Sequence, residues 1–195
     1  NEKPKCMIEA KKYEENYWDG DRKFGYGGYR YIPNRWTSVA KSLINSYNLT
    51  DRSKLLDVGC GKGFLLYEIK KMLPNIEVKG IEISEHAIKN SMPEIKNSII
   101  KQKAQEKYKF EDDYFDLVIS IGCLHNLEIF DLKSCLEQIQ RVSKRAYILV
   151  ESFRNEEELF NLQCWALTCQ SFFNSKEWIW LFDKFGYSGD YEFIY

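Results

Sequence analysis

The stretch Lys54–Leu66 constrains the fold more than any other part of the chain. Its sequence, KLLDVGCGKGFLL, joins an apolar run ending in an acid to three glycines at alternate positions and a second apolar run. A buried strand, a glycine turn and a helix in this order are typical of a nucleotide site, because glycine lets the backbone approach a ligand closely. The stretch therefore predicts an α/β fold with a nucleotide-like ligand at this turn.

Strand and helix patterns alternate along the rest of the chain. We expect strands at residues 54–58, 77–83, 98–101, 115–121, 147–150 and 191–195. Helices are expected from a cap at Asn34, over 64–73, from Ser84 up to Pro93, from a cap at Asp131, over 156–173, and from a cap at Ser175 to Gly186. This alternation predicts a doubly wound, mostly parallel sheet with helices on both faces, whose ligands bind at the carboxyl ends of the strands.

Composition and charge disfavour several classes of function. A net charge of −1 gives no basic surface for nucleic acid or an acidic membrane. No apolar run approaches the roughly 20 residues of a membrane span, and the N-terminus lacks a signal-peptide core, so we expect a cytoplasmic protein. The six cysteines form no C-x-x-C pair and only two histidines accompany them, which predicts reduced thiols and no metal site.

The spacing of the glycines narrows the choice of ligand. A Walker A loop requires Ser or Thr after the lysine, but Gly63 follows Lys62. A dinucleotide fingerprint requires a third glycine where this chain has Phe64. The remaining pattern, D-x-G-x-G-x-G after a strand, resembles motif I of the class I S-adenosylmethionine-dependent methyltransferases, and the resemblance extends over residues 35–195. It implies a Rossmann-like sheet of order 3-2-1-4-5 with a C-terminal antiparallel strand, although the family usually places that strand after the segment at 191–195.

The resemblance also implies a set of cofactor-binding residues. Glu82 follows Gly61 by 21 residues and ends the second strand, where an acid can accept both ribose hydroxyls. Asp57 is expected either to order the loop or to meet the ammonium of the cofactor. Relatives often carry an acid for the adenine amino group where this chain has Ala104, so Gln105 or backbone groups would substitute. The remaining cofactor residues on this reading are Gly59, Cys60, Gly61, Ile83 and Ile121.

Acceptor residues are expected on the same rim and in the segment before motif I. His125 is a candidate general base or substrate ligand, or else a structural histidine, and Asn126 could orient a polar group. Glu151 and Arg154 leave the fifth strand, either to bind substrate or to form an ion pair or helix cap. Tyr26, Tyr29 and Arg30 belong to an aromatic loop on glycine hinges, so residues 1–34 are expected to form an arm and lid on the methyltransferase domain at 35–195.

These features favour an enzyme that transfers methyl from S-adenosylmethionine to an O or N atom of a small polar molecule, such as a sugar, a surface-polysaccharide precursor or an amine. The alternatives are a protein or tRNA methyltransferase and a catalytically silent cofactor-binding subunit. We expect a small-molecule acceptor, no nucleic-acid or membrane partner, and a monomer or homodimer.

Overall fold

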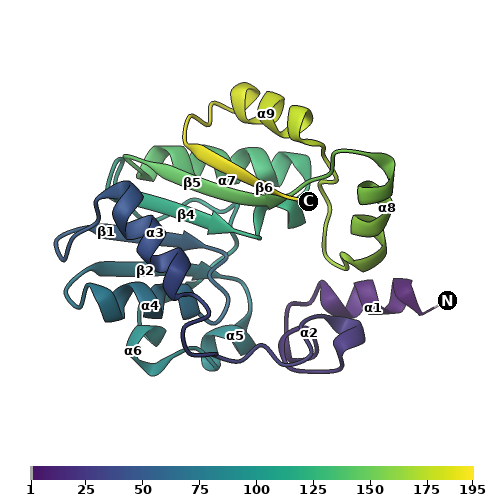
Figure 1. The fold of residues 1–195 in the computed structure, drawn as a ribbon, viewed down its shortest axis with the longest axis horizontal. Helices are drawn as coiled ribbons and strands as arrows, with labels where there is room; N and C mark the ends of the chain where they lie inside the picture. Colours follow the sequence, from purple (N-terminus) through teal and green to yellow (C-terminus); the bar gives the residue numbers. More distant parts are fainter. Residues whose placement is uncertain (1) are drawn as a thin grey trace.

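Six parallel strands form one sheet in the computed structural model, which describes residues 2–195 (Figure 1). The strands are β1 (Lys54–Val58), β2 (Glu77–Glu82), β3 (Ile99–Lys101), β4 (Leu117–Ile121), β5 (Ala146–Glu151) and β6 (Asp190–Ile194). Their spatial order is β3-β2-β1-β4-β5-β6. The order reverses between β1 and β4, which is the switch point at which such sheets bind ligands.

Nine α-helices surround the sheet in the described chain. They are α1 (Lys3–Ala10), α2 (Glu15–Trp18), α3 (Thr37–Tyr47), α4 (Phe64–Met72), α5 (Glu85–Lys89), α6 (Pro93–Lys96), α7 (Ile129–Val142), α8 (Glu156–Trp165) and α9 (Ser175–Lys184), with short 3-10 turns at Arg22–Phe24 and Leu124–Asn126. None of these helices is both long and apolar enough to traverse a bilayer.

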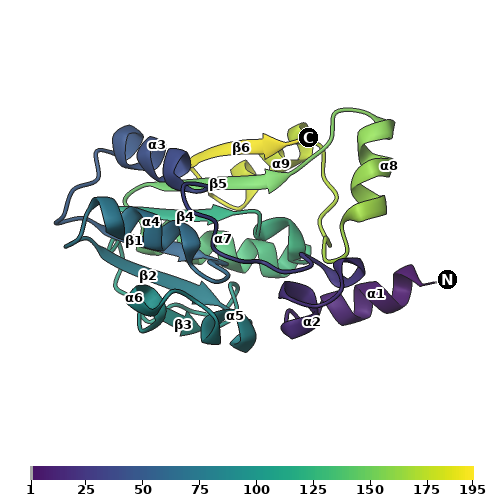
Figure 2. The ribbon, with the colours of Figure 1, turned by 60° about the horizontal axis from the view of Figure 1, so that its bottom comes forward.

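Two apolar clusters sandwich the sheet. Along β1, Leu56 and Val58 join the cluster under α7 and α9, whereas Leu55 joins the cluster under α3 and α4. This alternation follows from the two-residue period of a strand. Figures 1 and 2 both show α1, α2 and α8 beyond the carboxyl ends of the strands.

The α/β class, the parallel sheet and the helices on both faces are confirmed, but the C-terminal antiparallel strand is wrong. β6 pairs in parallel with β5, with Tyr147 opposite Asp190 and Glu151 opposite Ile194. Helix α9 lies between the two strands in the chain, so β6 starts at the same end of the sheet as β5. A helical crossover of this kind gives a parallel pair.

Three expected helix caps are displaced. Asn34 adopts a left-handed conformation (φ 68°), and the next helix begins only at Thr37. Asp131 lies inside the first turn of α7, which begins at Ile129. Asn174, not Ser175, caps α9, in a capping box with Glu177. In the last two cases a residue one to three positions earlier has the extended backbone that a cap requires.

Candidate active site

A cavity of about 520 Å³ lies at the carboxyl ends of β1, β2 and β4. Its wall combines the glycine turn after β1, the end of β2, the segment after β3, the start of α7 and the N-terminal arm. The sequence-predicted residues that line it are Tyr26, Tyr29, Asp57, Gly59, Cys60, Gly61, Glu82, Ile83, Ala104, Gln105, Ile121 and Asn126. The carboxyl ends of neighbouring parallel strands bring these distant segments together.

The glycine turn needs its glycines for both conformation and space. Gly59 and Gly61 have φ values of 80° and 55°, in the left-handed region that L side chains rarely adopt. A Cβ on Gly59 would collide with the Cys123 side chain, and one on Gly61 would come within 2.8 Å of the Trp18 ring. The Gly59 N–H donates to the Ile81 carbonyl at 2.8 Å, which fixes the turn against β2.

Two buried carboxylates face this turn. Glu82 accepts the Gly61 N–H and the Ser84 N–H, both at 2.8 Å. Burial raises the pKa of Glu82, although these N–H groups act in the opposite direction. Burial, with a smaller effect of the Glu82 charge, raises the pKa of Asp57 to about 7. No cation or N–H group within residues 2–195 compensates Asp57, so a positively charged ligand would be favoured beside it.

An acid also lies near the position that Ala104 occupies. Asp131, on α7, lines the cavity and accepts a hydrogen bond of 3.0 Å from the Gln105 amide. Sequence reasoning assigned Asp131 to a helix cap and missed it as a wall residue. Its position could have indicated this role, because Asp131 lies at the start of the helix that follows β4 and therefore at the carboxyl ends of the strands.

The N-terminal arm supplies an aromatic wall. Tyr13, Tyr17 and Trp18 line the cavity together with the expected Tyr26 and Tyr29. The Trp18 and Tyr26 rings stack, with centroids 5.3 Å apart and planes at 10°. Tyr26 is 45% exposed, and part of that surface faces the cavity. The first three aromatics were missed because no regular apolar period marks residues 1–23.

The remaining predicted acceptor residues lie outside this wall. Arg30 is exposed, and Arg154 pairs with Glu158 one helical turn away. His125 is only 7% exposed, and burial lowers its pKa to about 4. Its Nδ1 accepts a long 3.5 Å contact from the Glu151 N–H. Burial raises the pKa of the half-buried Glu151 carboxyl.

Two buried polar atoms at the cavity have no partner within residues 2–195. They are Nε1 of Trp36, a donor, and Oδ1 of Asn126, an acceptor. Leaving such an atom unpaired is unfavourable by about 1–3 kcal/mol. No group of three or more His, Cys, Asp or Glu side chains in the described chain could hold a metal ion, and all six cysteines there are free.

Comparison with known proteins supplies the family. Residues 49–186 match a methyltransferase domain. The mouse mitochondrial arginine-hydroxylase NDUFAF5 is 32% identical over 109 residues, covering 56% of this chain and 31% of that protein. The ribosomal RNA small subunit methyltransferase C of Buchnera aphidicola is 34% identical over 112 residues, covering 54% and 30%. A SAM-dependent methyltransferase structure from Aquifex aeolicus has a TM-score of 0.53 at 18% identity, covering 80% of this chain and 89% of that one.

The chain spans about a third of the length of these two curated relatives. The chemistry of the cavity nevertheless suits S-adenosylmethionine, which carries a carboxylate, an ammonium, a cationic sulfur and a ribose. A cradle that admits no Cβ, an uncompensated buried carboxylate and a second acid at the end of β2 are all present. The resemblance drawn from the sequence is confirmed, because the matched domain spans most of the chain. The chain belongs to the class I S-adenosylmethionine-dependent methyltransferases.

Proposed function

We propose that this protein transfers methyl from S-adenosylmethionine to an O or N atom of a small polar molecule held under the aromatic arm. The observation that carries the proposal is the single cavity that joins the uncompensated Asp57, beside the glycine turn, to the unpaired Asn126 Oδ1. The first group suits the cationic end of the donor, and the second suits an acceptor that donates a hydrogen bond.

The cofactor residues divide along the cavity. The N-terminus of α4, which follows the turn at Gly59–Gly61, would hold the carboxylate of the methionine part, since free N–H groups at a helix start favour an anion. Asp57 would take the ammonium. Glu82 has lone pairs beyond those used by Gly61 and Ser84, and would accept the ribose hydroxyls. Asp131 and Gln105 would receive the polar edge of adenine, beside Ile83.

The bound cofactor supplies a methyl group already activated by its cationic sulfur. The protein residues then have to position the acceptor and exclude water. Tyr26 and Tyr29 would enclose the acceptor, and Asn126 would orient it through its O–H or N–H. His125 lies outside the cavity wall, its ring contacts the Glu151 N–H, and its carbonyl accepts the N–H groups of Gln170 and Ser171, so this geometry supports a structural role over a catalytic base.

The acceptor is not carried over from the relatives, because their names point to different chemistry: an arginine hydroxylase and a ribosomal RNA methyltransferase. A protein or tRNA acceptor would require a binding surface outside the cavity. The net charge of −1 argues against an RNA. A cytoplasmic location, a monomeric or homodimeric state and the arm at residues 1–34 stay predictions.

Calorimetry with S-adenosylhomocysteine tests the cofactor assignment. Glu82→Ala should lose binding by about tenfold or more, since each lost charge-assisted hydrogen bond is worth about 1.5–3 kcal/mol. Glu85→Ala is the matched control, because Glu85 is an exposed acid three residues away whose side chain pairs with Lys101. No binding by the wild type, or full binding by Glu82→Ala, would refute the assignment.

A further inference from the structure

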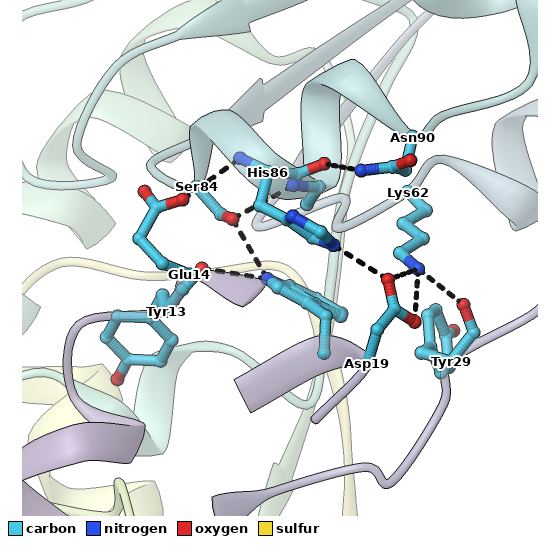
Figure 3. Close-up of polar contacts among 10 residues, drawn as sticks. Tyr13, Glu14, Asp19, Tyr29, Lys62, Ser84, His86 and Asn90 are labelled. Atoms are coloured by element: carbon cyan, nitrogen blue, oxygen red, sulfur yellow. Dashed lines mark hydrogen bonds and ion pairs between the residues drawn. The ribbon is translucent and has the colours of Figure 1, made fainter. Parts of the chain in front are cut away.

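Lys62 lies in the glycine turn but points away from the cavity. It is only 4% exposed, and its Nζ contacts both Asp19 carboxylate oxygens, at 2.8 and 2.7 Å, and the Tyr29 carbonyl at 2.8 Å (Figure 3). These partners come from the two ends of the arm segment 19–29. The Lys62 ammonium group therefore holds segment 19–29 against the glycine turn.

The loop after β2 holds the same arm. The His86 ring lies 2.7 Å from Asp19 Oδ2, so Asp19 bridges the two loops. Trp18 Nε1 donates to Ser84 Oγ at 2.9 Å, and the Glu14 carboxylate accepts N–H groups at the start of α5, including that of His86 at 3.1 Å. The pKa of Asp19 is lowered, because the hydrogen bonds from His86 and Lys62 outweigh the opposing effect of burial.

These ties place the aromatic wall. Trp18 lies over Gly61, where a Cβ would come within 2.8 Å of its ring. Tyr29 stacks on Phe64, the first residue of α4, with centroids 5.1 Å apart. The arm thus contacts the same two loops that carry Gly61 and Glu82, and its closed position depends on them.

We propose that Lys62 and Asp19 are positioning residues that hold the arm closed over the glycine turn, and that this bridge must open for the cofactor product to leave. Aromatic residues between positions 13 and 29 form a wall of the cavity beside the glycine turn, so a ligand seated in the cavity is enclosed on that side while the bridge is intact. The part concerning the product rests on the proposed function. The part concerning the arm stands on the contacts alone.

Limited trypsin digestion of the ligand-free protein tests the arm. Arg22 and Lys23 are exposed and lie within the fastened segment. Lys62→Met keeps the apolar stem but removes the bridge, and we expect cleavage after residues 22 and 23 to accelerate about tenfold, because local opening exposes a backbone site. Lys101→Met, which breaks the exposed Lys101–Glu85 pair, is the control and should leave cleavage unchanged.

Asp19→Asn is the second variant, in case Lys62→Met does not fold as judged by its melting curve. It leaves the buried Lys62 ammonium without its anion, so cleavage should accelerate at least as much as in Lys62→Met. Lys62→Arg, which retains a cation, should restore part of the protection. Cleavage at the wild-type rate in the folded Lys62→Met or Asp19→Asn protein would overturn the proposal.

Displacement of S-adenosylhomocysteine in a stopped-flow experiment tests the exit step. The dissociation rate should rise about tenfold in Lys62→Met and stay unchanged in Lys101→Met. Faster cleavage with an unchanged dissociation rate would overturn the exit step and keep the positioning role. Failure of the wild type to bind S-adenosylhomocysteine would refute the proposed function, and the digestion would still decide the role of Lys62.

Discussion

Replacing Asp57 with asparagine should stabilise the ligand-free protein while abolishing cofactor binding. Burial and the Glu82 charge raise the pKa of Asp57 from 3.8 to about 7. Between these two values the folded state retains a proton that the unfolded state has lost, so the free energy of unfolding falls as pH rises through this window. At 1.36 kcal/mol for each pKa unit, ionised Asp57 lowers the free energy of unfolding by about 4 kcal/mol at pH 8.

Asp57→Asn removes this charge, so the free energy of unfolding should rise by up to about 4 kcal/mol at pH 8 and by less than about 2 kcal/mol at pH 5. Urea unfolding followed by far-UV circular dichroism at the two pH values measures both. Calorimetry with S-adenosylmethionine should show lost binding in the same variant.

Glu68→Gln provides the opposite case. Glu68 is a buried acid on α4, but Tyr31, Thr37 and Lys71 donate to it and, against the effect of burial, lower its pKa. This variant should lose stability at pH 8, where Asp57→Asn gains it. An Asp57→Asn protein that is destabilised at pH 8, or changed equally at both pH values, would refute the reasoning.

Three further predictions concern single residues around the cavity. Burial lowers the pKa of His125 to about 4, so the free energy of unfolding of the wild type should fall by about 2 kcal/mol between pH 7 and pH 5. His125→Gln should not show this fall, and an equal fall in the two proteins, measured by thermal melting at both pH values, would contradict the prediction. Gly63→Ala should lose about 1–3 kcal/mol in urea unfolding, because φ is 69° and the new Cβ would collide with Ile95; an unchanged midpoint would show that the turn adapts. Asn126→Leu should keep its stability within about 1 kcal/mol and still bind S-adenosylhomocysteine, because its buried Oδ1 has no partner to lose; a large loss in either measurement would place Asn126 in the structural framework.

The order of strands and helices could be predicted because it depends on local pattern. The apolar runs, the glycine turn and the prolines are read within a few residues of each element, and the rim at the carboxyl ends follows from the topology. The direction of β6 could not be predicted in this way, since it depends on where α9 packs. The expected antiparallel strand came only from the usual topology of the family.

The contacts of the N-terminal arm could not be predicted from the sequence either. Asp19 meets Lys62 across 43 positions and His86 across 67. No periodicity in residues 1–23 encodes such contacts, because each depends on the folded positions of two loops. Lys62 could have been noticed in the sequence, because a lysine in a glycine turn that does not fit a Walker A pattern still needs a partner. In the structure that partner is Asp19, in the arm.

The two thiols beside the glycine turn bear on whether the protein could be alkylated by its own cofactor. Cys60 and Cys123 both line the cavity, and burial raises the pKa of each well above its ordinary value. The thiolate is the nucleophilic form of cysteine, so both side chains stay protonated and unreactive at neutral pH. A bound alkylating cofactor would therefore lie next to two protonated thiols, and their raised pKa values would protect the protein from modifying itself.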